Sequence, residues 1–513
     1  MSFRCLKPVL PYPKPVDNCY FYSSKPLLTK AQTMKTLKMI ALTLATLVLF
    51  SCSSTSTDGW ISLYDGKSLE GWTASENTDA WKIEDGAIVT GGERSHLFYT
   101  GDVLDHSFLN FEFSVDVMTQ PNSNSGVYIH TEFQEEGWPA KGYECQVLNS
   151  SGPGENVERK MSGSIYAVRN IWKSVQADHE WYTYRIVVQG KTIQTYINDM
   201  LLAEYTEPEV LWRPEGWAGR KLSPSGGTFA FQCHDPGSVV AYKNIKVKPL
   251  ADDLPTPGTP PEDLEFEEQI VRLATANIPL IDFHTHLKGG LTREEALAHA
   301  RSYGFNYGIA VNCGLKMGFE SDEELENYLD SFEPTPLAWH AMQAEGREWL
   351  DLFSEESRDR FDYVFTDAMT WTNNRGVRQR LWIPDETDVG DPQDFMDQLV
   401  ENIVKVVSSE PIDIHVNPTF LPAEIADRYD ELWTDERIDK VVKALAESGV
   451  ALEINNRYQI PSVAIIKKAK EAGVKFTLGT NNGGANDLGR MDYGIQMIRE
   501  LGLTSQDMWY PGM

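Results

Sequence analysis

The pattern of apolar and polar positions divides the chain into two regions with different periods. Between residues 60 and 250, short runs alternate apolar and polar side chains, and helical periodicity is almost absent. Turn residues such as Gln189-Gly190 separate these runs, which include 111–117, 183–188, 192–197 and 239–247. Alternation with a period of two, broken by turns, predicts an antiparallel sandwich of two β-sheets.

The pattern changes class beyond residue 278. A largely apolar run over 278–284 predicts a buried strand, 293–303 has the spacing of a helix, and 307–311 predicts a second strand. The alternation of strand and helix continues through 451–454, 463–472 and 475–478. Repeated βα units favour a parallel α/β barrel of the TIM type.

A proline-rich segment lies between the two patterns. Residues 254–261 read Leu-Pro-Thr-Pro-Gly-Thr-Pro-Pro, which can continue neither a sheet nor a helix. We therefore expect a sandwich over 58–250, a linker and lead-in over 251–277, and a barrel over 278–513.

The N-terminal residues have the order of a lipoprotein signal. Lys35 and Lys38 follow Met34, a largely apolar run of twelve residues spans 39–50, and Ser51-Cys52 comes next. A membrane-spanning helix needs about 20 apolar residues, so an anchor helix is the weaker alternative. We expect a non-native leader over 1–33, a signal peptide over 34–51, lipid on Cys52 and a tether over 52–57. Ser53 rather than aspartate after Cys52 favours the outer membrane of a bacterial cell envelope.

Composition restricts the partners. The formal net charge of −29 disfavours nucleic acids and anionic lipids, because their phosphates would be repelled. A small carbohydrate fits better, and the density of tryptophans between residues 60 and 217 agrees, although core packing explains such residues equally. Membrane contact is expected only through the lipid. Cys145 and Cys233 could form a disulfide in an oxidising compartment, but buried free thiols are the commoner outcome.

Two strand-like segments concentrate polar side chains on one face. In 142–146, Glu144 and Gln146 point the same way, and in 229–234, Gln232 and His234 flank Cys233. We expect the two pairs to share a face of the sandwich.

The order of six motifs over 58–250 resembles the 3-keto-disaccharide hydrolase family, which includes 3-keto-glucoside lyases and hydratases. The motifs are Leu-Tyr-Asp-Gly-Lys-Ser-Leu-Glu-Gly-Trp (63–72), Trp-Lys-Ile-Glu-Asp-Gly (81–86), Asn-Ser-Gly-Val-Tyr (124–128), Gly-Tyr-Glu-Cys-Gln (142–146), Gly-Ser-Ile-Tyr (163–166) and Gln-Cys-His (232–234). The resemblance implies a concanavalin-like jelly roll whose concave face holds a sugar. His130 departs from the family pattern, which usually has arginine there.

Cleavage of a 3-keto-glycoside requires a base near the carbon next to the ketone. A ring ketone acidifies the neighbouring C–H, so a base can form an enolate that expels the glycosidic oxygen, without two carboxylates flanking an oxocarbenium ion. We expect Glu144 to be the base and His234 its acid or base partner. The expected sugar contacts are Gln146, Gln232, Tyr166, His130 and Asn124. A polar binding face without chemistry is the alternative.

In the barrel, polar residues follow the expected strand ends, where functional groups of such barrels lie. His284 and His286 form a His-x-His pair that can bind one metal ion. With Glu345 and the segments 413–418 and 452–455, they resemble the polymerase-and-histidinol-phosphatase family over about 278–505. The resemblance implies a metal-dependent phosphoesterase.

Several positions depart from that second family. Asn312-Cys313 stands where the family has Asp-His, Asp367-Ala368-Met369 replaces Ser-x-His, Asn417-Pro418 replaces His-Pro, and 480–483 replaces Ser-Asp-x-His. Phosphoryl transfer normally uses two or more cations, so this activity is not expected. The remaining option is a site for one divalent metal ion of unknown identity, to which Asp367 could be a further ligand. The alternative is a barrel without metal. The candidate ligands are His284, His286, Glu345, His415 and Glu453.

The preferred prediction is an exported lipoprotein enzyme whose sandwich cleaves or hydrates 3-keto-glycosides; lyase, hydratase and net hydrolase remain open. One alternative is a sugar-binding sandwich that delivers substrate to a metal-dependent hydrolase barrel. The other is a sugar-binding lipoprotein without catalysis.

Overall fold

The computed structural model describes residues 58–152 and 157–512, which fall within one compact unit, Ser53–Met513. The predicted leader, signal peptide, lipidated Cys52 and tether lie outside the described residues. None of the helices in the described ranges combines the length and apolarity that a membrane crossing requires.

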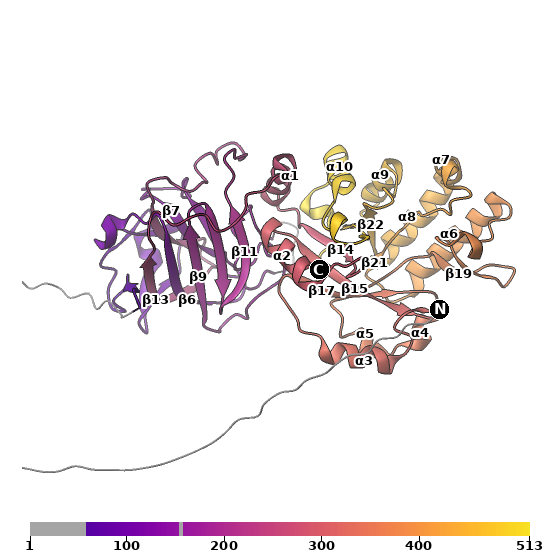
Figure 1. Cartoon of the computed structure of the whole chain (residues 1–513), viewed down its shortest axis with the longest axis horizontal. Helices are drawn as coiled ribbons and strands as arrows, with labels where there is room; N and C mark the ends of the chain where they lie inside the picture. The colour runs from indigo at the N-terminus through magenta and orange to yellow at the C-terminus, as the bar shows by residue number, and fades with distance from the viewer. Residues whose placement is uncertain (1–57, 153–156, 513) are drawn as a thin grey trace, which may run out of the picture. The chain divides into compact units, whose positions relative to one another are not determined.

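The first domain consists of two antiparallel sheets. The larger sheet has the strand order β11-β10-β9-β6-β13-β4-β3, with β1 paired to β13, and its central strands run side by side in Figure 1. Its strands are β1 (Ile61–Ser62), β3 (Trp81–Glu84), β4 (Ala87–Thr90), β6 (Phe111–Thr119), β9 (Tyr182–Gln189), β10 (Thr192–Ile197), β11 (Met200–Thr206) and β13 (Val240–Pro249).

The smaller sheet has the order β2-β5-β12-β7-β8. Its strands are β2 (Trp72–Ala74), β5 (Ser95–Tyr99), β7 (Ser125–Thr131), β8 (Tyr143–Val147) and β12 (Thr228–Cys233). This topology confirms the predicted sandwich, and the strands expected around 111–117, 183–188 and 192–197 are β6, β9 and β10.

Aromatic residues fill the space between the sheets. Phe229 and Phe231 of β12 point to the larger sheet, where their rings lie 4.4 Å from Phe113 and 4.2 Å from Tyr242. Because side chains alternate along a strand, Gln232 must project from the opposite face of β12. That outer face of the smaller sheet carries the candidate site. Cys145 and Cys233 are buried free thiols, the commoner of the two expected outcomes.

The second domain is a closed barrel of seven parallel strands in the order β14-β23-β22-β21-β18-β17-β15, which β14 and β15 close by pairing. The strands are β14 (Ile281–Thr285), β15 (Asn306–Gly314), β17 (Ala338–Ala344), β18 (Tyr363–Thr366), β21 (Ile414–His415), β22 (Ala451–Asn455) and β23 (Phe476–Gly479). Three short strands lie outside the ring: β16 (Met317–Gly318), β19 (Thr370–Thr372) and β20 (Arg378–Arg380). This confirms the TIM-type prediction.

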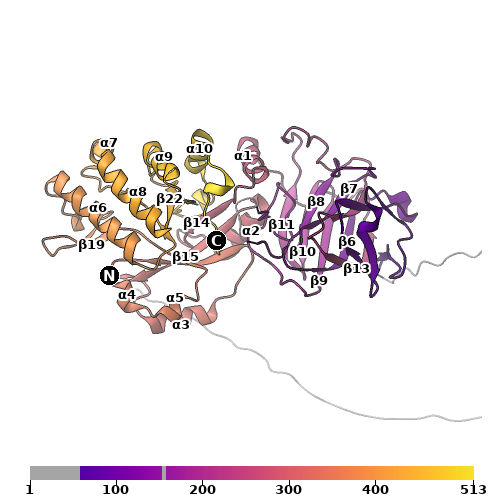
Figure 2. The same cartoon turned by 180° about the vertical axis from the view of Figure 1, so that it is seen from behind.

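Helices follow the barrel strands and pack on one another in sequence, α6 on α8, α8 on α9 and α9 on α10 (Figure 2). The helices are α1 (Leu264–Thr275), α2 (Arg293–Tyr303), α3 (Asp322–Ser331), α4 (Trp349–Leu352), α5 (Glu355–Arg358), α6 (Pro392–Ser409), α7 (Tyr429–Leu432), α8 (Asp435–Ser448), α9 (Val463–Glu471) and α10 (Asp492–Leu501). Helix α1 occupies part of the segment expected to be a linker, and the Asp263 side chain caps it by accepting from the Phe266 amide.

Candidate functional site

Glu144 on β8 is the centre of a buried hydrogen-bond cluster on the outer face of the smaller sheet. Its side chain is only 7% exposed. Tyr128 Oη donates to Glu144 Oε2 over 2.9 Å, and Gln232 Nε2 donates to Oε1 over 2.9 Å. Arg220 Nη1 lies 3.5 Å from Oε2 and has no hydrogen-bond partner of its own among the described residues. The carboxylate is therefore held in one orientation and forms an ion pair with the Arg220 guanidinium.

Strand register brings these groups together. β7 lies between β8 and β12, Tyr128 pairs with Glu144 across one ladder, and Ala230 pairs with Tyr128 across the other. Gly126, two residues before Tyr128, leaves room for the carboxylate, because an added Cβ would lie 2.9 Å from Glu144 Cγ and 2.9 Å from Oε1.

The amides beside Glu144 keep free acceptors. Gln146 Nε2 donates to Asn124 Oδ1 over 2.8 Å, so these two expected sugar contacts meet. The oxygens Gln146 Oε1 and Gln232 Oε1 are buried and have no partner in the described part of the chain. A buried acceptor without a donor is costly. Ligand hydroxyl groups would satisfy both oxygens.

His234 follows β12 and pairs with the next residue. Its Nδ1 lies 2.7 Å from Asp235 Oδ2, and its side chain is 35% exposed. Burial alone would raise the pKa of Asp235, but hydrogen bonds from His234 and Ser238 lower it. The resulting carboxylate fixes the orientation of the imidazole. The Trp138 ring lies 5.1 Å from the His234 ring.

His96 on β5 belongs to the same cluster, although sequence reasoning missed it. It pairs with Gln232 in the strand register, and its ring packs edge-on against Tyr128 and Trp138, 5.5 Å from each. Both ring nitrogens are buried without partners among the described residues. Burial, assisted by the charge of Arg94, lowers the pKa of His96 to about 3. His96 is therefore a neutral imidazole that can accept or donate a hydrogen bond.

Two expected sugar contacts are engaged elsewhere. Tyr166 Oη donates to Glu158 Oε2 over 2.9 Å, and the buried Lys160 ammonium lies 2.7 Å from Glu158 Oε1. His130 Nε2 lies 3.0 Å from the Leu109 carbonyl, and its Nδ1 accepts from the Ser223 amide. The structure does not bring His130 to Glu144. The expectation rested on the family position, where arginine is usual; here the β7–β12 pairing is irregular and His130 has a φ of 53°.

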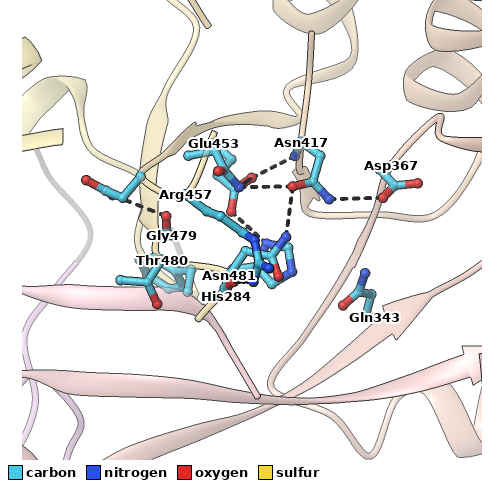
Figure 3. Close-up of polar contacts among 12 residues, drawn as sticks. His284, Gln343, Asp367, Asn417, Glu453, Arg457, Gly479, Thr480 and Asn481 are labelled. Atoms are coloured by element: carbon cyan, nitrogen blue, oxygen red, sulfur yellow. Dashed lines mark hydrogen bonds and ion pairs between the residues drawn. The ribbon is translucent and has the colours of Figure 1, made fainter. Parts of the chain in front are cut away.

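In the barrel, a second buried network joins His284 to Glu453. His284 Nδ1 lies 2.7 Å from Glu453 Oε1, and Glu453 Oε2 accepts from the Asn417 amide over 2.7 Å. Asn417 Nδ2 also donates to Asp367 Oδ2 over 3.1 Å, and Asn417 Oδ1 accepts from Asn481 (Figure 3). A neutral amide thus connects two buried carboxylates.

The donors of the barrel do not fit a metal ion. In the described ranges, no three His, Cys, Asp or Glu side chains converge as a cation site. His284 and Glu453 bond each other, Glu345 Oε1 accepts from Gln343 Nε2 over 2.8 Å, and both nitrogens of His415 lack a described partner. His286 lies next to His284, with ring centroids 5.2 Å apart. The expected five-residue ligand set is therefore not assembled.

Comparison with known proteins agrees with the geometry. Residues 59–248 match the model of the 3-keto-alpha-glucoside-1,2-lyase-like domain. This region is therefore similar to that domain family. A 3-keto-disaccharide hydrolase from Bacteroides thetaiotaomicron is 26% identical over 234 residues, which cover 38% of this chain and 79% of that protein. A putative glycosyl hydrolase structure from Parabacteroides distasonis is 24% identical with a TM-score of 0.33, covering 38% of this chain and 95% of the other.

The second domain is similar to phosphatases. A probable phosphatase from Thermoanaerobacter sp. is 27% identical over 124 residues, which cover 22% of this chain and 45% of that protein, less than half of its length. The structure of histidinol phosphate phosphatase from Lactococcus lactis, complexed with zinc, L-histidinol and phosphate, is 14% identical with a TM-score of 0.32. That match covers 45% of this chain and all of the other.

Proposed function

We propose that the lyase-like domain cleaves 3-keto-glycosides by forming an enolate. The observation that carries the proposal is the buried Glu144 carboxylate, held by Tyr128 and Gln232 beside two unpaired amide oxygens. The family match over 59–248 and the 3-keto-disaccharide hydrolase relative support the substrate class.

Glu144, Arg220 and His234 each have a separate role in the proposed reaction. The ketone at C3 acidifies the C2–H bond; Glu144 takes that proton, and the electron pair moves onto the ketone oxygen as an enolate. The enolate then re-forms the ketone, a C1–C2 double bond appears, and the C1–O bond to the aglycone breaks. Arg220, which forms an ion pair with Glu144 and whose Nη1 makes no hydrogen bond to a described residue, is placed to stabilise the enolate. His234 donates a proton to the departing oxygen. Adding water to the double bond would make the net reaction a hydrolysis.

The test compares a 3-keto-glucoside with its unoxidised parent, using the soluble chain from residue 53 onward and measuring aglycone release. We expect release from the keto sugar alone and a loss of about 100-fold or more in Glu144→Gln, because a general base contributes about 10²–10⁴-fold. Glu295→Gln, on the exposed first turn of α2, is the matched control and should keep the full rate. Equal cleavage of both glycosides, or an active Glu144→Gln, would reject the proposal.

We further propose that the protein is exported and anchored to the cell envelope by lipid on Cys52. The order of charged, apolar and small residues over 34–52 supports this. Incorporation of a labelled fatty acid into the wild-type protein, and its loss in Cys52→Ser, would be the expected result. Labelling that persists in Cys52→Ser would contradict the assignment.

A further inference from the structure

The mouth of the barrel contains a cavity of about 460 Å³. It is lined where the parallel strands end, the usual place for ligands in such barrels. Amide and carboxyl side chains form one part of its wall: Asn312, Gln343, Glu345, Asp367, Asn417 and Asn481. The cavity volume falls within the range of small-molecule sites, about 300–1,000 Å³.

Two buried side chains in this wall have unsatisfied oxygens. Gln343 is 5% exposed and Glu345 is 3% exposed, yet Gln343 Oε1 and Glu345 Oε2 have no hydrogen-bond partner among the described residues. The bond between Gln343 Nε2 and Glu345 Oε1, 2.8 Å long, holds both groups in place and leaves the other oxygen of each without a hydrogen-bond partner among the described residues, with the His286 imidazole beside Gln343. Buried acceptors are almost always paired in proteins, so their position on a cavity indicates a ligand that supplies hydrogen-bond donors.

The rest of the wall indicates the kind of ligand. Trp382 and Tyr458 add aromatic surface, which can pack against the apolar face of a ring. Lys288 and Arg457 add donors at the rim, where Arg457 Nη1 donates to the Asn481 carbonyl over 3.0 Å and Lys288 Nζ lies 3.5 Å from Asn481 Oδ1. Acceptors on one part of the wall, donors on another and rings beside them match the alternating hydroxyl and C–H groups of a sugar.

A metal ion is not needed to stabilise the buried carboxylates here. Asn417 donates its backbone amide to Glu453 and its side-chain amide to Asp367. Hydrogen bonds from a neutral group therefore take the place of a cation between these two acids. The positions at which the chain departs from the phosphatase-like motif, Asn312, Asn417 and Asn481 among them, also line the cavity.

We propose that this cavity is a metal-independent binding site for a monosaccharide-sized sugar. Sugar binding here does not depend on the lyase reaction, because the residues that line the cavity all come from the barrel domain.

The test measures sugar binding to the chelator-treated soluble chain by calorimetry and by saturation-transfer NMR. The probes are D-glucose, D-glucuronate and inorganic phosphate. We expect at least one of the two sugars to bind and Gln343→Leu, a substitution of similar size that removes the unpaired oxygen, to weaken that binding about tenfold or more. Gln232→Leu is the matched control in the lyase-like domain and should leave this binding event unchanged.

Other results would overturn the proposal. One is sugar binding that survives Gln343→Leu and disappears in Gln232→Leu, which would assign all binding to the other domain. Another is the absence of binding by either sugar, or binding of any probe only after Zn²⁺ or Mn²⁺ is added. If Gln343→Leu fails to fold, Asn481→Ala at the rim carries the same expectation, with urea unfolding as the check. A lyase that is inactive but still binds sugar in the barrel would reject only the proposed function.

Discussion

Gly126 offers a sharp test of how the cluster on the lyase-like domain is built. Its Cα faces the Glu144 side chain, and a methyl group added there would lie 2.9 Å from both Cγ and Oε1 of Glu144. Gly126 does not have a positive φ, so Gly126→Ala introduces no backbone strain and acts through this contact. The methyl group and the carboxylate cannot both keep their places.

The size of the loss in rate and stability follows from the hydrogen bonds of Glu144 that the substitution would lengthen. Its Cγ is fixed between the main chain and the hydrogen bonds from Tyr128 and Gln232, so relief of the contact must lengthen those bonds. Overpacking of a well-filled site costs about 1–3 kcal/mol of unfolding free energy. A catalytic group displaced by about 1 Å can cost about 100-fold in rate. We therefore expect Gly126→Ala to lower kcat about 100-fold and unfolding free energy by about 1–3 kcal/mol.

Aglycone release and urea unfolding measure the two quantities. Gly91→Ala is the control, because an added Cβ at Gly91 meets no atom within 4 Å and its φ is not positive. That variant should retain both rate and stability. A Gly126→Ala enzyme with the wild-type kcat would refute the argument that the position of Glu144 limits the reaction.

Three further predictions concern buried polar groups. His96 should lower the free energy of unfolding as the pH falls from 6.5 towards 3, because its imidazole is protonated in the unfolded chain but stays neutral in the folded one. The loss reaches about 2 kcal/mol at pH 5. Urea unfolding of His96→Phe should lack this pH dependence. Glu453→Ala should lower the free energy of unfolding by about 3 kcal/mol or more in the same assay, because three buried donors, one of them on His284, lose their acceptor. A decrease below about 0.5 kcal/mol would contradict this. Burial raises the pKa values of the three buried thiols of the soluble chain. These thiols should resist a thiol reagent at pH 7 in the native protein and react after unfolding in urea. Rapid labelling of the native protein would count against the described packing.

Local rules predicted the parts of the fold that depend on neighbours in sequence. Helix α2 occupies the residues whose spacing predicted a helix; in the structure a capping box of Thr292 and Glu295 begins it, and Gly304 ends it with a φ of 71°. The alternation along β8 and β12 placed Glu144 and Gln232 on one face, where they bond. Helix α1 was not predicted, because it directly follows a proline-rich segment that cannot itself be helical; the Asp263 cap marks its start.

Contacts between distant strands could not be predicted in the same way. His96 joins the cluster only because β5 pairs with β12, a choice between strands more than a hundred residues apart. His130 was assigned to the site because it stands where the resembled family usually has arginine, and a motif position does not reveal the local irregularity in the pairing of β7 with β12. In the barrel, the strand-end rule gathered the polar residues at one mouth, but it does not say which side chains bond each other and which meet the cavity.

Asn417 shows why a ligand set inferred from residue types need not assemble. The phosphatase-like motif has histidine at this position, and the ring nitrogen of a histidine can bind a cation. The amide instead donates to Asp367 and accepts from Asn455 and Asn481, while its backbone N–H donates to Glu453. One neutral side chain thus contacts both acids, and Gln343 and Glu345 line the cavity with oxygens that have no hydrogen-bond partner in the described part of the chain. The same substitution that weakens a metal site can therefore create a site for an uncharged, hydroxyl-rich ligand.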